Sequence, residues 1–553
     1  MKSGDSRYLW LAAAAVLGLA VRLGLLAASP EALLSRYGSD DLFYYTRVAE
    51  SLASGHGFTF DGEHPTTGVQ PLFTLLLAGF VPFFRGRPEM ALTVDLLLVT
   101  LLTLVTGFLL PRAVTQLLKV YPTAGKLGEE GAADLGVLVG CVWLLHPRIL
   151  VATFDGTEGA LAGFCWTLSL LLWARDDGSP GAATRLGFSL GLGILARVDH
   201  ALLLLAFVLF LPRNLPTSRW KRALRIGATS FLVILPWLAV ELSTTGSLLP
   251  DSGSAKRTAY ERIFAEEVGA PVAGFRALRY PWPRAARLLP DLKDAVGHEL
   301  LGTGGRLSRA TLALALAALL LALALPRARS RLVSASTFST LRAVTRTAAP
   351  FHLAAFGLVP VYVVVLYRMR MWYLVPAILA LTLLAAALAG DVAARLRAVL
   401  PSRARLLVLP AIGVIWLIFA GAEELLTPRD RFLSAHLQAA RRAATLTPDG
   451  ARIGAFNAGV LGAFCGPAGR VVVNLDGVVN HSALEALRGF RLTSYIRQER
   501  IEFVVDYIPS LRFFDRISAP GLMSELELLS EVPVRGSLEG VGIFRVRPPA
   551  LGP

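Results

Sequence analysis

The chain has 553 residues, of which 54% are hydrophobic and only 17% are charged, and its mean hydropathy is +0.56. Because a soluble domain carries about a quarter charged residues, this composition excludes an ordinary soluble protein and indicates a polytopic membrane protein. The formal charge of +15 comes from basic residues in short loops between apolar runs, which the positive-inside rule explains without nucleic-acid binding.

Apolar runs near the roughly 20-residue length of a membrane helix recur along most of the chain. The first run, Leu9 to Leu26, follows Lys2 and Arg7 as in a signal peptide. No small-residue cleavage site with a soluble mature region follows, so we expect a retained helix. The predicted apolar segments are 8–28, 68–84, 90–110, 134–151, 158–174, 186–197, 200–212, 226–243, 306–326, 350–367, 373–390 and 406–421.

The orientation of these segments follows from the arginine-rich loops 213–225, 327–346 and 395–405, which we expect in the cytoplasm. Counting membrane crossings away from these loops places the N-terminus inside and the C-terminal part outside. The parity of crossings then requires that one segment between 68 and 151 does not span. The candidate is 68–84, which is short and carries two prolines. The prediction is a polytopic α-helical protein with about 11 spanning helices and one non-spanning segment.

The segment 186–212 is interrupted by the charged stretch "ARVDH". It is therefore predicted to split into two short helices with Arg197, Asp199 and His200 at membrane depth. An Arg197–Asp199 pair could simply lock a helix bend. Charged side chains within a membrane cost free energy and usually serve a function. A polar cavity for a charged ligand is therefore a compatible alternative.

The composition changes after about residue 421. Short apolar strands such as "RVVVNL" alternate there with helical stretches and glycine turns, a pattern typical of an α/β domain. We expect a membrane domain over 1–421 and an extracytoplasmic soluble α/β domain over 422–553.

Charged side chains gather on the predicted outer side of the membrane. They are Asp40, Asp41, Arg47, His56 and His64 in the first loop, Asp155 and Glu158 in "FDGTEGAL", Asp251, Lys256 and Arg257 in the third loop, and Arg368 and Arg370 beside Trp372 and Tyr373.

Each of these motifs also has a simpler interpretation. Asp40 and Asp41 could cap the helix that follows them, and "DGTE" could be a capping box. The arginines of "YRMRMWYLVP" could snorkel at the interface. The two histidines lack metal-ligand spacing on one element. All the motifs are predicted to lie on the outer side of the membrane and at the same depth, and this agreement favours a functional site.

Carboxylates and several cations at the outer boundary suit a sugar carried on a lipid phosphate. Such a leaving group needs cationic neutralisation, and the acceptor hydroxyl needs a carboxylate base. A two-carboxylate hydrolase competes with this interpretation, as do a lipid or polysaccharide transporter or flippase and a catalytically silent scaffold.

The stretch "SDDLFYYTRVAESLASGHGF" resembles the first outer loop of the GT-C superfamily of polyprenyl-phosphate-sugar-dependent glycosyltransferases, which includes protein O-mannosyltransferases and lipid A aminoarabinose transferases. "DGTEGAL", "ARVDH" and "YRMRMWYLVP" resemble later motifs of that superfamily in order and spacing. "HPTTGVQP" lacks the lysine of the aminoarabinose transferases. The resemblance implies an inverting transfer on the outer face of a bacterial plasma membrane to a glycan, lipid or protein acceptor.

The resemblance also implies roles for individual residues. Asp40 would be the catalytic base, with Asp41 as the second acid. Asp41 and Glu158 would orient the sugars, and Arg197, Lys256, Arg368 and Arg370 would neutralise phosphate. The remaining substrate-binding candidates are Asp155, Asp199, His200 and Tyr373. Some members use a divalent metal, which Asp40, Asp41, Asp155 and Glu158 could hold; the sequence leaves this open.

Overall fold

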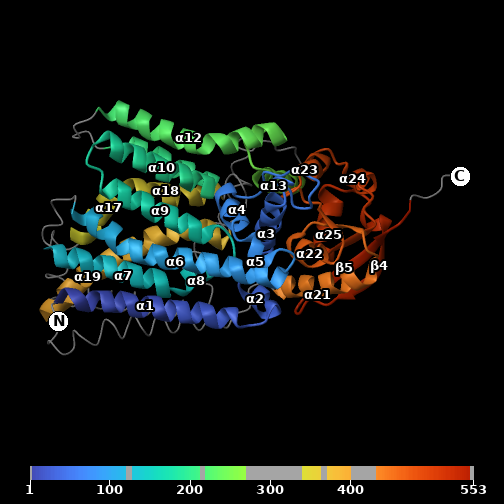
Figure 1. Cartoon of the computed structure of the whole chain (residues 1–553), viewed down its shortest axis with the longest axis horizontal. Coiled ribbons are helices and arrows are strands. Elements are labelled where there is room, and N and C mark those ends of the chain that lie inside the picture. Colours follow the sequence, from blue (N-terminus) through green and yellow to red (C-terminus); the bar gives the residue numbers. More distant parts are fainter. Residues whose placement is uncertain are drawn as a thin grey trace.

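The computed structural model describes residues 3–119, 128–211, 218–268, 339–362, 370–399 and 431–548. A long helical part runs along the molecule, and an α/β domain covers one end of it (Figure 1). The predicted segments 306–326 and 406–421, and Arg368, lie outside the described residues.

Among the described residues, three helices are long and apolar enough to cross a membrane: α1 (Ser3–Leu26), α6 (Pro88–Lys119) and α12 (Arg219–Thr245). A bent pair passes the same test together, α7 (Gly128–Leu145) and α8 (Pro147–Thr153), which meet at an angle of 61°. Pro147 has no N–H to donate and therefore interrupts the helix. The lengths and composition of these helices place the protein in a membrane.

Further described helices belong to the helical part. They are α9 (Gly159–Ala174), α10 (Pro180–Ala196), α11 (Ala201–Leu209), α17 (Ser339–Thr347), α18 (Ala349–Val361) and α19 (Val375–Val399). Along the bundle α1 packs on α7, α7 on α6, α6 on α9, α9 on α10 and α10 on α12 (Figure 1).

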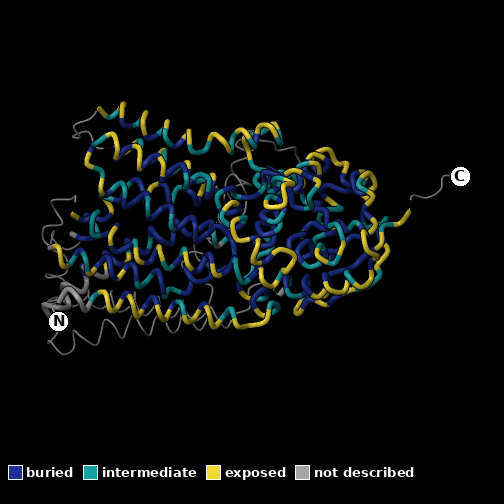
Figure 2. Tube along the Cα trace, in the orientation of Figure 1, coloured by how far each residue is buried: buried dark blue, intermediate teal, exposed yellow. Residues whose placement is uncertain are grey.

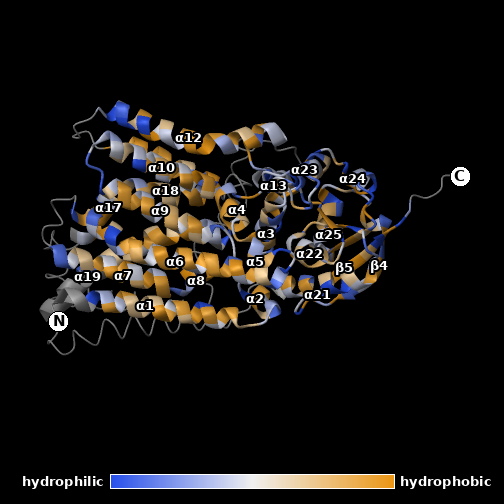
Figure 3. Cartoon of the chain, in the orientation of Figure 1, coloured by the Kyte–Doolittle hydropathy of each residue, from blue (hydrophilic) through white to orange (hydrophobic). Residues whose placement is uncertain are grey.

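The outer surface of the bundle is apolar where a soluble protein would be polar. Trp220, Leu224 and Leu232 of α12 are 81%, 74% and 65% exposed. Figure 2 shows many exposed residues along α1 and α12, and Figure 3 shows that much of these helices is hydrophobic. A surface of this kind is stable in lipid rather than in water.

Glycines let two of these helices approach closely. A Cβ on Gly140 of α7 would lie 2.8 Å from the carbonyl oxygen of Gly107 in α6. Small residues at helix crossings are the usual means of tight packing within a membrane.

The segment 68–84 forms two short helices, α4 (Pro71–Ala78) and α5 (Val81–Phe84). At 1.5 Å per residue the longer one rises only about 12 Å, less than half of a bilayer core of about 30 Å. Neither helix is long enough to span alone, and the non-spanning character of 68–84 stays a prediction.

The chain breaks at Arg197, as the "ARVDH" stretch predicts. α10 ends at Ala196, Arg197 is extended with φ −160° and ψ 124°, and a 3₁₀ turn, η2 (Val198–His200), leads into α11.

The C-terminal domain is an α/β fold, as predicted. Its strands are β1 (Arg452–Ala455), β2 (Val471–Asn474), β3 (Phe503–Tyr507), β4 (Leu526–Val532) and β5 (Val541–Val546), in the order β2-β1-β3-β5-β4. β1 pairs in parallel with β2 and β3, whereas β5 is antiparallel to β3 and β4. Its helices are α21 (Arg431–Leu446), α22 (Gly459–Cys465), α23 (His481–Arg488), α24 (Leu492–Gln498) and α25 (Ile508–Ile517).

Several described helices of the membrane part pack on this domain. α2 (Pro30–Arg36) packs on α21, α3 (Asp40–Ala53) packs on α22, and α13 (Asp251–Val268) packs on α23. Asp251 joins three segments: its carboxylate accepts the Thr67 N–H at 3.0 Å and faces His481 Nδ1 at 2.8 Å. The first loop, α13 and the C-terminal domain therefore form one junction.

Gly68 should be essential for this junction, because a Cβ there would lie 1.6 Å from the carbonyl oxygen of Val478. We expect Gly68→Ala to destabilise the protein by about 1–3 kcal/mol through overpacking. Thermal unfolding and limited proteolysis of the C-terminal domain measure the effect. Gly253→Ala is the control, since nothing lies within 4 Å of its Cβ; equal loss in both variants would contradict the assignment.

Candidate functional site

The site is organised by α3, which begins directly at the two adjacent acids. Ser39 is the N-cap, and its hydroxyl accepts the Asp41 N–H at 3.2 Å. The acids themselves occupy the first turn, so the capping motif is formed by the serine and frees both carboxylates. Successive helical residues point about 100° apart, and residues four apart share a face. Asp40 therefore shares a face with Tyr44, and Asp41 with Tyr45.

The first face binds the C-terminal domain. The carboxylate oxygens of Asp40 accept the backbone N–H groups of Gly459 at 3.0 Å and of Val460 at 2.8 Å. The hydroxyl of Tyr44 accepts the Ala458 N–H at 3.1 Å. Burial raises the pKa of Asp40, although the N–H groups of Val460 and Gly459 and the nearby His436 act in the opposite direction.

The second face points to the membrane domain. Tyr45 donates a hydrogen bond of 2.6 Å to Glu158, the N-cap residue of α9. Asp41 is partly exposed, and no described residue donates a hydrogen bond to its carboxylate. Its negative charge nevertheless acts on Lys256: burial alone would lower the pKa of that lysine, but Tyr373 and Asp41 outweigh burial and raise it. Among the described residues, Asp41 is thus a carboxylate without a hydrogen-bond donor, and its charge acts on Lys256.

Arg197 lies at the centre of a buried network. Its guanidinium bonds Glu158 on one side and Asp199 on the other, the latter at 2.9 Å through one terminal nitrogen. Tyr362 bonds both Arg197 and Asp199, and the guanidinium lies 4.7 Å from the ring centre of Tyr373. Arg197 is only 3% exposed. The Arg197–Asp199 pair that the simpler interpretation of "ARVDH" expects is present at the helix break. The polar cavity for a charged ligand stays a prediction.

Two further cations adjoin this network. Lys256 on α13 donates a hydrogen bond of 2.9 Å to the hydroxyl of Tyr373. Arg370 precedes the 3₁₀ turn η6 (Met371–Leu374) and lies 5.7 Å from the ring centre of Trp372. Within the described ranges, neither cation is paired with a carboxylate.

The C-terminal domain contributes a carboxylate that the sequence analysis missed. Asp476 lies in the loop after β2, where one of its oxygens accepts the Val478 N–H at 2.9 Å. Burial raises the pKa of Asp476 to about 7, while the Val478 N–H, Asn474 and Lys256 oppose that shift. The Asp-Gly pair of "NLDGVVN" was visible in the sequence, but only as a turn signal.

Tyr45 and Tyr362 were also missed. Tyr45 could have been found from the sequence, because it stands four residues after Asp41 on the same helix face. Tyr362 could not, because its contacts with Arg197 and Asp199 join helices distant in sequence.

The structure thus brings together Asp41, Glu158, Arg197, Asp199, Lys256, Arg370 and Tyr373.

His200 lies elsewhere: its ring packs edge-on against Trp166, with centroids 5.3 Å apart. Asp155 accepts the N–H and hydroxyl of Thr157 at 3.0 and 2.9 Å. "DGTE" is therefore an Asx turn and not a capping box, because Glu158 caps α9 without a side-chain bond. Arg368 is outside the described residues.

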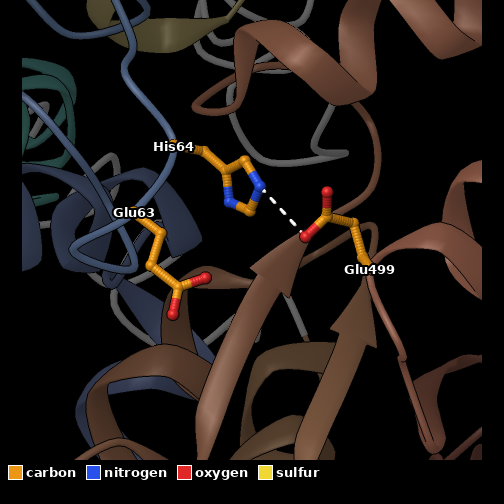
Figure 4. A group of neighbouring side chains, drawn as sticks. All are labelled: Glu63, His64 and Glu499. Carbon is orange, nitrogen blue, oxygen red and sulfur yellow. Dashed lines mark ion pairs between the residues drawn. The ribbon is translucent and has the colours of Figure 1, made fainter.

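The acids considered for a divalent metal do not form a ligand set. In the part of the chain that the structure describes, the one group whose ligand atoms all lie within 4.8 Å of one another is Glu63, His64 and Glu499 (Figure 4). Arg452 already pairs with Glu63 at 2.9 Å and with Glu499 at 3.0 Å. This cluster is an ion-pair network between the first loop and the C-terminal domain. Asp40 and Glu158 are likewise engaged by backbone N–H groups and by Arg197.

Comparison with known proteins gives a relationship in structure alone. No family model and no curated protein matches the sequence. The crystal structure of ArnT from Cupriavidus metallidurans bound to undecaprenyl phosphate matches with a TM-score of 0.51 and 14% identity, over 96% of this chain and 97% of that one. The apo oligosaccharyltransferase of Archaeoglobus fulgidus gives 0.49 and 14%, over 92% and 71%. Both belong to the GT-C superfamily.

The chain has a GT-C fold. The resemblance inferred from the first-loop motif is confirmed at the level of the fold. A GT-C membrane domain followed by a small mixed sheet also accounts for the change in composition after residue 421.

The attachment of the GT-C membrane domain to its C-terminal domain should depend on pH through His64. Its ring nitrogens face Asp61 at 2.7 Å and Glu499 at 3.2 Å. Burial opposes protonation, but these two carboxylates raise the pKa of His64. A raised pKa in the folded state contributes stability below the unfolded value of about 6.5, and this stability is lost as pH rises through the raised pKa.

We therefore expect His64→Gln to lower the melting temperature more at pH 6 than at pH 9, measured by thermal unfolding. His56→Gln alters an exposed histidine of the same loop and is the control. A difference that is the same at both pH values would exclude the His64 ion pairs as its source.

Proposed function

We propose that this protein is an inverting glycosyltransferase that moves a sugar from a polyprenyl-phosphate-linked donor to an acceptor hydroxyl. The support is the GT-C fold together with three side chains. Among the described residues the Asp41 carboxylate has no hydrogen-bond donor, its charge acts on Lys256, and neither Lys256 nor Arg370 has a carboxylate partner. The ArnT structure that shares this fold was solved with undecaprenyl phosphate bound. The donor proposed for this chain would carry its sugar on a lipid phosphate of the same kind.

The catalytic base in this proposal is Asp41. The sequence resemblance assigned that role to Asp40, but both oxygens of Asp40 accept backbone hydrogen bonds from the C-terminal domain. A base must lie within hydrogen-bond reach of the proton it removes, and a carboxylate without protein donors can accept that proton most readily. Asp41 would deprotonate the acceptor hydroxyl as it attacks the anomeric carbon. The bond from that carbon to the phosphate oxygen then breaks, which inverts the configuration.

Lys256 and Arg370 would bind the donor phosphate. The leaving group departs with its negative charge, so it needs fixed positive charge more than a general acid. Lys256 is oriented by its bond to Tyr373, and Arg370 by its position beside Trp372. The predicted role of Arg197 changes: its charge is balanced by Glu158 and Asp199, and we assign it the support of Glu158 and Tyr373.

Sugar hydroxyls would be bound by the carboxylates around this centre. Glu158 is held rigidly by Arg197 and by Tyr45. Asp476 approaches from the C-terminal domain and is partly exposed. We propose that this site lies on the outer side of a bacterial plasma membrane. The arginine-rich loops predict that the C-terminal domain is outside, and the family resemblance implies the bacterial location. The acceptor would be a hydroxyl of a glycan, lipid or protein.

Asp41→Asn should reduce kcat by about 10²–10⁴-fold, because the amide cannot accept the proton of the acceptor. The assay is transfer from a synthetic polyprenyl-phosphate sugar by the purified full chain in lipid nanodiscs. The melting temperature serves as the control for folding. Turnover at the native rate in a folded Asp41→Asn protein would reject the assignment.

Arg370→Ala should raise the KM for the donor by roughly 10- to 100-fold, the loss expected for one charge-assisted hydrogen bond to phosphate. The KM for the acceptor should change little. Arg257→Ala is the matched control, because Arg257 neighbours Lys256 but pairs with Glu261 at 2.7 Å. An unaltered donor KM in Arg370→Ala would remove Arg370 from the phosphate site.

A further inference from the structure

Five consecutive backbone N–H groups, those of residues 456–460, are all bound by side chains. Asp506 accepts the first two at 2.7 and 2.8 Å. Tyr44 accepts the third at 3.1 Å, and Asp40 accepts the last two at 3.0 and 2.8 Å. This segment leads from the end of β1 into α22, and three of its five bonds go to α3 of the membrane domain.

The segment lies at the carboxyl ends of the parallel strands β1 and β3. This edge is where open α/β sheets bind their ligands, and free backbone N–H groups there favour an anion. In this protein the anion is the Asp40 side chain of the same chain. Gly459 permits the approach, because a Cβ at that position would lie 2.2 Å from the Asp40 carbonyl oxygen and 2.8 Å from its Oδ1.

A second layer holds the segment in place. The Asn457 side-chain amide donates to Asp506 at 2.8 Å, and the ring of His436 lies 3.5 Å from the same carboxylate. Asp506 and His436 are both fully buried. The N–H groups that receive Asp40 are therefore fixed by the core of the C-terminal domain, so they fix Asp40 in turn.

We propose that Asp40 is a positioning residue, through which the C-terminal domain sets the direction of Asp41. This inference rests on the proposed function, in which Asp41 is the base. Both acids lie in the first turn of α3, so a rotation of that turn moves both carboxylates together. Asp40 binds the C-terminal domain on one face of α3. This bond fixes the first turn, so that the Asp41 carboxylate on another face points toward the acceptor. A misplacement near 1 Å at a reacting group can cost about 100-fold in rate.

The test compares Asp40→Asn with Asp41→Asn in the full chain in nanodiscs. An asparagine at 40 retains one acceptor oxygen, but its NH₂ group faces a backbone N–H, so the attachment weakens without loss of side-chain size. We expect kcat to fall about 10- to 100-fold with the donor KM unchanged. The acidic limb of the pH profile, which reports ionisation of the base, should remain.

Hydrogen exchange of the peptide covering 456–462 gives a readout that does not depend on activity. Its amides should exchange faster in Asp40→Asn and, to a smaller extent, in Tyr44→Phe, because the bonds that protect them are lost. Asp41→Asn should leave their exchange at the native rate. Failure of the native chain to transfer any sugar would reject the proposed function, whereas this exchange result would still decide whether the attachment exists.

Arg262→Ala is the control for general docking. Arg262 of α13 donates to the carbonyls of Ile517 at 3.0 Å and Arg488 at 2.8 Å, so it joins the same two domains away from Asp40. Its variant should keep the native kcat. Three results would overturn the proposal: unchanged exchange in Asp40→Asn, an equal loss of kcat in Arg262→Ala, or complete loss of turnover and of the acidic limb in Asp40→Asn.

Discussion

The rotation of about 100° between neighbouring residues of an α-helix is the constraint on which this site depends. It separates two adjacent acids at the start of α3 by direction, so that Asp40 meets the backbone of the C-terminal domain, whereas the charge of Asp41 acts on Lys256. The same period places Tyr44 and Tyr45 one turn after the two acids. Tyr44 accepts the Ala458 N–H, next to the N–H groups that bind Asp40, and Tyr45 donates to Glu158. One short helix thus connects the membrane domain, the α/β domain and the proposed reaction centre.

Arg197 supports the other wall of the site. A buried guanidinium is costly unless it is paired and hydrogen-bonded, and here it is bonded by Glu158, Asp199 and Tyr362. This arrangement joins the helix break after α10 to α9 and α18. Since the charge of Arg197 is already balanced, Lys256 and Arg370 are the cations that we propose for the phosphate. In this proposal charge balance separates the supporting cation from the two binding cations.

Much of the fold could be predicted from the sequence, because apolar length, proline and arginine-rich loops act locally. The short helices in 68–84, the break at Arg197 and the α/β nature of the C-terminal part all follow from such signals. The roles of individual residues could not be separated in this way. His200 stands next to Asp199 yet packs on Trp166, and Asp40 matches a catalytic motif yet binds Gly459. Both outcomes depend on tertiary partners hundreds of residues away or on another helix, which periodicity does not encode.

The most direct measurement is a cryo-electron microscopy structure of the chain with a non-transferable polyprenyl-phosphate sugar analogue. The phosphate should lie against Lys256 and Arg370, with the Asp41 carboxylate on the side of the anomeric carbon open to an acceptor. Asp40 should still accept the N–H groups of Gly459 and Val460. A structure in which Asp40 has left α22 and faces the anomeric carbon, or in which the phosphate lies far from both cations, would contradict the division of roles between the two acids.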